Sequence, residues 1–533
     1  MADGVLIEVE AGLFARVGRG WPGEWGSGDV PVSAAGLEQV VASFSASWSL
    51  FGALVEELED ESADVLTHGQ LEDLIAARGR EVMRRLLQDD LDLRSIREPR
   101  LTEVRGADQV VRRRIEPGHE RLLATVFGAV TVTRTAYRAL GASNLHPMDA
   151  GLNLPGERSS HGLRKLAAVE AVRGSFDDAQ AAIERSCGTR VGKRQIEQLT
   201  VRTAVDVEAF YRAKAPLPCT ADTLLALGGR QGHRDAPRGA DRLHPQGRPG
   251  QGRQQDAHPP RVRGEERPQA YGDARRRLRR RARTPRRRGR HHPDHDRSGA
   301  RNRGPKAFNK WLTGSVTDDT RTVISAVFDQ AEQRDPLHAR TWIVLVDGAR
   351  AQIEQIQTEA ALRGVNVDIV VDFVHVLEYL WKAAWCFHTA GDPAAEGWVA
   401  EQARTILAGN SGLTVTEIRT AAKTAALGED KLKTIEGVCG YLENKSPYLR
   451  YDAALVDGWP IATGIIEGAC RHLVKDRLDI TGARWSLAGA EAVLTLRALI
   501  SNRDFDAYFA WHLTREHQRV HQSRYQDKLN LAA

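Results

Sequence analysis

Two carboxylates occupy positions where a divalent metal could be held. Asp347 directly follows the apolar run Thr341 to Val346, which is typical of a buried strand. Open α/β sheets place ligands and catalytic groups at the carboxyl ends of their parallel strands. The chemistry expected of such an aspartate is coordination of a metal that activates water for attack on a phosphodiester. The alternative for an isolated Asp-Gly after a strand is a residue that only shapes a turn.

Glu467 is the second carboxylate, and basic side chains are dense around it. Arg471 and Lys475 follow it at helical spacing, so the three side chains would project from one face of a helix. A carboxylate surrounded by cations suits a site that binds metal and phosphate together. The alternative is a solvent-exposed ladder of ion pairs. The basic residues within eighteen positions after it are Arg471, His472, Lys475, Arg477 and Arg484.

DNA binding is indicated by three helical patterns upstream of the carboxylates. Ser175 and Asp178 have the spacing of a capping box, and Gly188 is a typical helix end. Helix, tight turn, helix is the arrangement of a helix-turn-helix. The three patterns are Gly162 to Arg173, Phe176 to Cys187 and a last one from about Val191.

The second helix of that motif would present polar side chains to a DNA groove, while neighbouring basic residues contact phosphates. The alternative is an ordinary helical bundle with a solvated charged face. The residues expected in the groove are Lys193, Arg194, Gln195 and Gln198, and those expected at phosphates are Arg164, Lys165 and Arg190.

The elements that would position Asp347 form a β-α-β unit. Residues 393–455, after it, are helical with breaks at Gly409 and Gly428, and we interpret them as an all-α insertion. The unit consists of a strand at Thr341 to Val346, a helix from about Ala349 to Arg363, a strand at Val365 to Val371 and a helix from Phe373 to about His388.

Other elements are predicted by hydrophobic periodicity. Leu122 to Ala139 alternates around Gly128, which predicts a β-hairpin. Leu37 to Leu58, Gly69 to Asp90 and Ala488 to Arg503 show helical spacing. The chain begins with no signal-like segment and contains no run of about 18 apolar residues, so we expect no membrane partner and a location in the cytoplasm, associated with the nucleoid.

Residues 228–303 differ in composition from the rest of the chain. They hold 23 Arg against 8 Asp plus Glu, a local balance of +15, so the remaining residues carry −10 of the net +5. No Lys, Ile, Phe, Met or Trp occurs there. Such a stretch cannot build a core, and we expect it to be disordered. An arginine-rich linker that touches nucleic acid is one explanation.

A second explanation is a shift of reading frame in a GC-rich gene. Reading the permitted codons one nucleotide later from Gly228 allows the string Val-Asp-Gly-Lys-Gly. That string would continue the apolar run Leu224 to Leu227 as a strand ending in Asp, a usual place for a catalytic carboxylate. We favour this explanation, although the choice of codons at degenerate positions is free.

Four strings carry a resemblance to a known family. LVDGAR at residues 345–350, VDFVHVLEYLW at 371–381, GIIEGACR at 464–471 and TGARW at 481–485 resemble the ISKra group of insertion-sequence transposases, which is similar to the wider mutator-like transposases. The resemblance runs from about Leu122 to Phe509 and is interrupted by residues 228–303, which we call the aberrant segment.

The resemblance implies a ribonuclease-H-like α/β domain with an Asp, Asp, Glu triad and an all-α insertion before the third member. Asp347 matches the second member and Glu467 the third, while the first exists only in the shifted frame, across the codons of Gly229 and Arg230. His375 matches a His that would orient the site or contact DNA. The alternative for His375 is a helix-start residue packed beneath the sheet.

The function implied is DNA strand cleavage and transfer, with Mg²⁺ or Mn²⁺ as cofactor and insertion-sequence ends and target DNA as partners of a homo-oligomer. The chain as written would be inactive, since its first Asp is missing. The alternative is a non-enzymatic, sequence-specific DNA-binding protein. The expected regions are a mainly helical part at 1–115, the hairpin and helix-turn-helix at 116–215, a region with the aberrant segment at 216–303, the catalytic core at 304–392, the insertion at 393–455 and a C-terminal catalytic helix region at 456–533.

Overall fold

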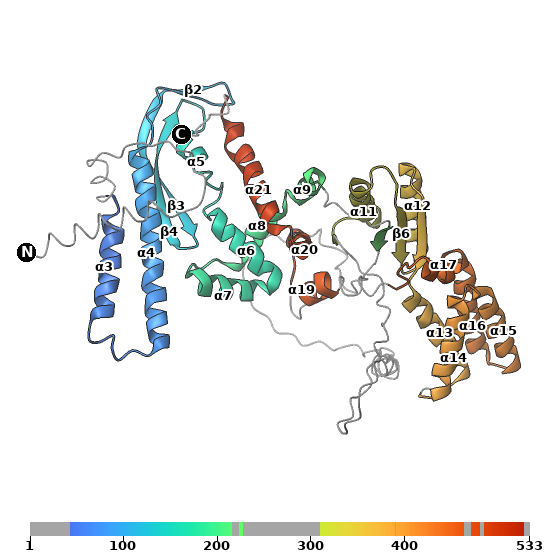
Figure 1. The fold of residues 1–533 in the computed structure, drawn as a ribbon. Coiled ribbons are helices and arrows are strands. Elements are labelled where there is room, and N and C mark those ends of the chain that lie inside the picture. Colours follow the sequence, from blue (N-terminus) through green and yellow to red (C-terminus); the bar gives the residue numbers. More distant parts are fainter. Residues whose placement is uncertain are drawn as a thin grey trace, which may run out of the picture. The chain divides into compact units, whose positions relative to one another are not determined.

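A computed structural model of the chain describes residues 43–215, 223–227, 310–389, 391–462, 471–479 and 484–526. These residues form a mixed α/β structure that is mostly helical, with small sheets (Figure 1). They belong to two compact units. Of the described residues, the first unit comprises 43–163, 186–189 and 517–526, and the second comprises those within 164–185 and 190–516.

The first unit contains the predicted β-hairpin. Strands β3 (Arg114–Thr125) and β4 (Gly128–Arg138) pair antiparallel, so the prediction is confirmed and the first strand begins earlier than expected. Thr125 pairs with Gly128, whose φ of 125° suits glycine at this tight turn. Helix α4 (His68–Ile96) packs against β4, α3 (Ser45–Glu59) packs against α4, and the short helix α5 (Pro147–Gly151) also contacts β4. Both α3 and α4 overlap the ranges predicted to be helical, Leu37 to Leu58 and Gly69 to Asp90.

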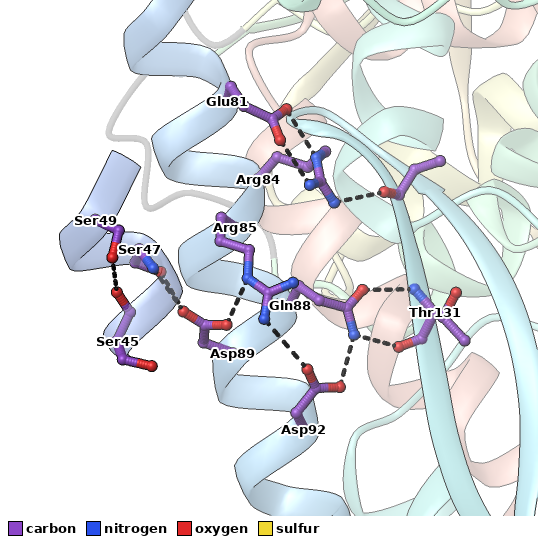
Figure 2. Close-up of polar contacts among 11 residues, drawn as sticks. Ser45, Ser47, Ser49, Glu81, Arg84, Arg85, Gln88, Asp89, Asp92 and Thr131 are labelled. Carbon is purple, nitrogen blue, oxygen red and sulfur yellow. Dashed lines mark hydrogen bonds and ion pairs between the residues drawn. The ribbon is translucent and has the colours of Figure 1, made fainter. Parts of the chain in front are cut away.

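Polar side chains of α4 join this helix to its neighbours (Figure 2). The Gln88 side chain forms two hydrogen bonds with the backbone of Thr131. Its amide nitrogen donates to the Thr131 carbonyl oxygen at 2.8 Å, and its amide oxygen accepts from the Thr131 nitrogen at 2.8 Å. Asp89, which is buried, accepts hydrogen bonds from the backbone and hydroxyl of Ser47 on α3 and forms an ion pair of 2.7 Å with Arg85. Gln88 therefore occupies backbone groups at an edge of β4 that would otherwise be open to pairing with another strand.

The end of the chain folds with the first unit. Helix α21 (Phe505–Val520) continues into a short 3-10 turn, η3 (Gln522–Arg524). The His521 ring nitrogen lies 2.7 Å from the carbonyl oxygen of Leu154, and Tyr525 bridges to Gly106. Residues 517–526 thus belong to a different unit from most of the region predicted at 456–533.

The second unit contains a three-stranded parallel sheet in the order β5-β6-β7. Its strands are β5 (Thr223–Leu227), β6 (Thr341–Val346) and β7 (Val367–Val371). Helices α12 (Arg350–Arg363) and α13 (Phe373–Phe387) follow β6 and β7. The predicted β-α-β unit is confirmed. Five of the six β6 residues are buried, as its continuous apolar sequence requires of a central parallel strand.

Residues 393–455, which we interpret as an insertion, are helical as predicted, and the breaks at Gly409 and Gly428 fall between helices. The elements are α14 (Pro393–Leu407), α15 (Ser411–Thr424), α16 (Glu429–Lys445), the 3-10 turn η1 (Ser446–Tyr448) and α17 (Tyr451–Val456). Buried side chains of these helices share one hydrophobic core with the sheet. The insertion is therefore built onto the sheet and is no separate domain.

A second core in the same unit is all helical. It collects apolar side chains from α6 (His161–Arg173), α9 (Val207–Ala213), α20 (Leu487–Ser501) and α21. The remaining helices of the second unit are α7 (Phe176–Cys187), α8 (Lys193–Ala204), α11 (Thr320–Arg334) and α19 (Asp476–Leu478). The three helical patterns predicted between residues 162 and 211 therefore correspond to α6, α7 and α8.

Candidate functional site

The carboxyl edge of the parallel sheet is the candidate site. Asp347 follows the last residue of β6, the central strand of the three, and its side chain is partly exposed. One carboxylate oxygen of Asp347 accepts a hydrogen bond of 3.1 Å from the Ala349 backbone nitrogen. The other accepts none from any residue that the structure describes, so it is available to a ligand. Oxygen ligands of this kind are those that Mg²⁺ prefers.

Gly348 shapes the turn after Asp347. Its φ of 90° lies in the left-handed region that favours glycine. A Cβ atom placed on Gly348 would lie 3.3 Å from the hydroxyl oxygen of Tyr441 and 3.5 Å from a methyl group of Val371. The chain therefore passes close to α16 and to β7 at this point.

Asp372 is level with Asp347 on the neighbouring strand, since Val346 pairs with Val371. Its side chain has a structural task, because it caps α13 by accepting a hydrogen bond of 2.8 Å from the Val374 nitrogen. Only 3% of Asp372 is exposed. Its backbone nitrogen donates to the Val346 carbonyl oxygen at 2.7 Å, which ties the ends of β6 and β7 together.

His375 lies at the start of α13 and faces outward. Its side chain is 41% exposed, and its Nδ1 atom is 3.5 Å from a carboxylate oxygen of Glu378. The alternative of a histidine packed beneath the sheet is wrong. Orientation of the site or contact with DNA by His375 stays a prediction.

Tyr441 on α16 also reaches this edge, and the sequence analysis did not single it out. Its ring stacks on that of Tyr379, with centroids 3.6 Å apart and planes 4° apart. Its hydroxyl oxygen is buried and has no hydrogen-bond partner among the described residues. Burial is the main cause that raises the pKa of this hydroxyl, and the charges of Asp347 and Asp372 add to it.

Lys445, one turn after Tyr441, adds a cation near the same edge. Burial, followed by the charge of Arg350, lowers the pKa of the Lys445 ammonium group, and the charge of Asp347 opposes that shift. Tyr441 therefore lies beside the turn that follows β6, and the charges of Asp347 and Lys445 act on each other there. No spacing in the sequence points to Tyr441 or Lys445, because both come from the insertion.

Glu467, the predicted third carboxylate, lies outside the described residues, and so do residues 228–303, where the first one was expected. Arg471 and Lys475 form part of a π-helical turn, η2 (Arg471–Lys475), and both are exposed. Arg484 is exposed as well. These three cations are accessible to a phosphate, as their predicted role requires.

Arg477 corrects the prediction of a DNA contact. It is 1% exposed, and its Nε atom donates a hydrogen bond of 2.9 Å to the Ala171 carbonyl oxygen near the end of α6. Its guanidinium lies 4.2 Å from the centre of the Trp485 ring. A cation suits this place because carbonyl groups at a helix C-terminus carry partial negative charge. Arg477 therefore holds the helical core together and cannot reach a phosphate.

Arg164 corrects a second predicted phosphate contact. It is fully buried, and its guanidinium forms two hydrogen bonds with the carboxylate of Glu516 on α21. Glu516 also contacts the ring of His512 at 3.1 Å, and the other ring nitrogen of His512 lies 2.6 Å from Asp206. Although burial opposes it, hydrogen bonds from His512 and Arg164 hold the pKa of Glu516 well below its usual range. The predicted DNA ligand is part of a buried charge network.

The rest of the predicted DNA-binding face is at the surface. The capping box of α7 is confirmed, with the Ser175 nitrogen 3.1 Å from a carboxylate oxygen of Asp178 and the Asp178 nitrogen 3.0 Å from the Ser175 hydroxyl. Gly188 after α7 has the expected left-handed conformation, with φ of 70°. Lys165 is partly exposed, and the predicted contacts that are exposed are Arg190, Lys193, Arg194, Gln195 and Gln198.

Two of these cations already have acidic neighbours. Lys193 lies 2.8 Å from Asp177, and Lys165 lies 2.7 Å from Asp506. Exposed pairs of this kind contribute little to stability and exchange easily for a phosphate. The opposite face of α8 is buried, through residues such as Ile196 and Leu199. Helix α8 therefore has one buried face and one polar face that is exposed to solvent.

Within the described residues, no three His, Cys, Asp or Glu side chains form a group that could hold a metal ion, and no helix is both long and apolar enough to cross a membrane. No protein-family model matches the chain, no curated protein is similar to it, and no solved structure matches it.

Proposed function

We propose that this chain derives from a DDE transposase of a bacterial insertion sequence and has lost the first of three metal-binding carboxylates. In an intact relative, a ribonuclease-H-like domain would hold two Mg²⁺ ions about 3.5 to 4 Å apart. Asp347 and Glu467 would be the second and third ligands. The ions would support attack of water, and then of a DNA 3′-hydroxyl, on phosphodiesters.

The observation that carries the proposal is the register of the parallel sheet. Leu227, the last residue of β5, pairs with Leu345 of β6. If this register continued for two more residues, position 229 would be level with Asp347. Position 229 is where the shifted frame supplies an aspartate. Neighbouring strands lie about 4.8 Å apart, and level residues point to the same face. Two carboxylates placed so would share a pair of metal ions.

The present chain carries Gly229 in place of that aspartate. Loss of a carboxylate that bridges two ions weakens both metal sites, so we expect the chain as written to be inactive. Detection of Mg²⁺-dependent strand cleavage by the purified chain would contradict this expectation. The genomic reading frame offers a second check, because undisturbed codons for residues 228–303 in close relatives would remove the frameshift.

One observation favours a second function, sequence-specific DNA binding without chemistry. Helix α8 exposes Lys193, Arg194 and Gln198 on one face while its other face is buried. A helix of this kind can enter a major groove, where such side chains contact bases and phosphates. This function needs neither Asp347 nor Glu467.

Substitution of the two carboxylates distinguishes the two functions, in a chain whose frame has been repaired between Leu227 and Gly304. The repaired chain and its Asp347→Asn and Glu467→Gln variants are compared for binding and for Mg²⁺-dependent cleavage of DNA that carries the element's ends. The transposase proposal predicts binding by all three and cleavage by the repaired chain alone. Equal binding without cleavage by any of them would favour the DNA-binding protein.

A further inference from the structure

We propose that Tyr441 is a positioning residue of the sheet-edge site, donating a hydrogen bond to a metal-bound water or a phosphate oxygen beside Asp347. The inference rests on the proposed function, because it assumes that Asp347 binds a metal. It assigns to the helical insertion a direct part in building the site. No spacing or motif in the sequence indicates this part.

The position of the hydroxyl is the first argument. It lies beside Gly348, where a Cβ atom would be only 3.3 Å from it, and Gly348 is the residue that follows Asp347. The hydroxyl is buried from solvent and has no partner among the described residues. A buried hydroxyl without a hydrogen-bond partner destabilises the folded state. Such a destabilisation is understandable where a ligand completes the hydrogen bond.

The ring of Tyr441 is held firmly, which is the second argument. It is stacked in parallel on Tyr379 of α13 at 3.6 Å. The Nζ atom of Lys382 lies 4.1 Å from the centre of the Tyr379 ring. This arrangement fixes the ring between α13 and α16, so the hydroxyl needs no reorganisation to meet a ligand. Groups fixed in this way orient the ligands of metal sites.

The third argument is the charge around the hydroxyl. Asp347 and Asp372 lie close enough for their charges to act on it, and Lys445 on the same helix is close enough to Asp347 for the same effect. A donor among carboxylates and a cation suits a site for a hydrated metal ion or a phosphate. An apolar ligand would leave these groups unpaired.

The test is Mn²⁺ binding by the full chain after repair of its frame between Leu227 and Gly304, because loss of the first carboxylate is expected to weaken both metal sites of the chain as written. Binding is measured by calorimetric titration and by electron paramagnetic resonance of free Mn²⁺. This repaired wild type is compared with its Tyr441→Phe, Asp347→Asn and Tyr448→Phe variants. The last is a matched control, because Tyr448 lies just after α16 and its hydroxyl receives a hydrogen bond of 3.2 Å from Gln357. Thermal unfolding of each variant is recorded in parallel.

We expect Tyr441→Phe to weaken Mn²⁺ binding about tenfold or more, the usual effect of losing an outer partner of a metal site. It should leave the unfolding temperature unchanged or slightly higher, and Tyr448→Phe should bind Mn²⁺ like wild type. If Asp347→Asn weakens binding while Tyr441→Phe does not, the role of Tyr441 is refuted and the metal site stands. If Mn²⁺ binding is absent or indifferent to Asp347→Asn, the metal site itself is refuted, and the inference falls with it.

Discussion

Replacement of Arg164 by Met should destabilise the helical core of the second unit severely. Arg164 is fully buried, and its guanidinium is bonded to Glu516, which also contacts His512. Without the arginine, the Glu516 carboxylate would remain buried with one cationic partner fewer. Removing one member of a buried ion pair costs about 3–5 kcal/mol, because the other charge stays behind without compensation. A surface arginine that contacts DNA would cost almost nothing.

Hydrogen exchange followed by mass spectrometry can measure this cost locally, in peptides from α6 and α21. A loss of about 3–5 kcal/mol corresponds to exchange that is faster by roughly two to four orders of magnitude. Lys165→Met is the matched control, since Lys165 is the next residue on the same helix and pairs at the surface with Asp506. Its exchange should change by less than about tenfold.

The double variant Arg164→Met with Glu516→Leu should recover part of the stability, because no unpaired carboxylate then remains. Equal exchange rates for Arg164→Met and Lys165→Met would refute the buried network. A loss of DNA affinity in Arg164→Met at unchanged stability would restore the original prediction that this arginine contacts a phosphate.

Three other predictions concern stability. Acidification from pH 6.5 towards 4 should destabilise the first unit, because burial lowers the pKa of His146 and of His521 to about 4 and the unfolded chain therefore takes up protons first. The expected loss is about 3 kcal/mol for each of the two histidines. Denaturant titrations that give the same midpoint near neutral pH and near pH 4 would contradict this prediction. Gln88→Leu leaves the backbone groups of Thr131 without partners and should lower the free energy of unfolding by about 2–4 kcal/mol. Urea unfolding followed by circular dichroism measures this loss, and a loss under about 0.5 kcal/mol would contradict the prediction. Arg477→Met should lower the unfolding temperature, followed by tryptophan fluorescence, without reducing DNA affinity, whereas reduced affinity at full stability would mean that Arg477 does contact DNA.

Local patterns were sufficient to predict the elements around Asp347. The run Thr341 to Val346 is a strand with the predicted bounds, because a threonine and five apolar residues followed by Asp-Gly leave few alternatives. The bounds of β7 are less accurate, since Val367 begins the strand two residues later than predicted. The insertion helices were predictable because glycines separate them and because their apolar residues recur at helical spacing.

The roles of the buried arginines were not predictable, because sequence shows charge and not burial. Arg164 and Glu516 are 352 positions apart, and Arg477 and the Ala171 carbonyl are 306 positions apart. Long-range pairs of this kind have no local signature. Arg164 was expected to contact a phosphate because it lies in the predicted helix-turn-helix region, and Arg477 because it follows Glu467, but each completes a buried core.

The contribution of Tyr441 was missed for a similar reason. Its helix lies in a region whose sequence is that of an ordinary helical bundle, and no local pattern shows that its ring stacks on Tyr379 or that its hydroxyl lies beside Gly348. The placement of residues 517–526 in the first unit was also unforeseen, because their partners, such as Leu154 and Gly106, lie near the start of the chain.

The central claim is that a carboxylate level with Asp347 has been lost from the end of β5. Cleavage of DNA carrying the element's ends, in the presence of Mg²⁺, tests it most directly when the present chain is compared with one whose frame is repaired between Leu227 and Gly304. The account predicts cleavage by the repaired chain, none by the present chain, and none by a repaired chain in which the restored aspartate is changed to Asn. Cleavage by the present chain, or cleavage by the repaired chain that survives loss of that aspartate, would contradict it.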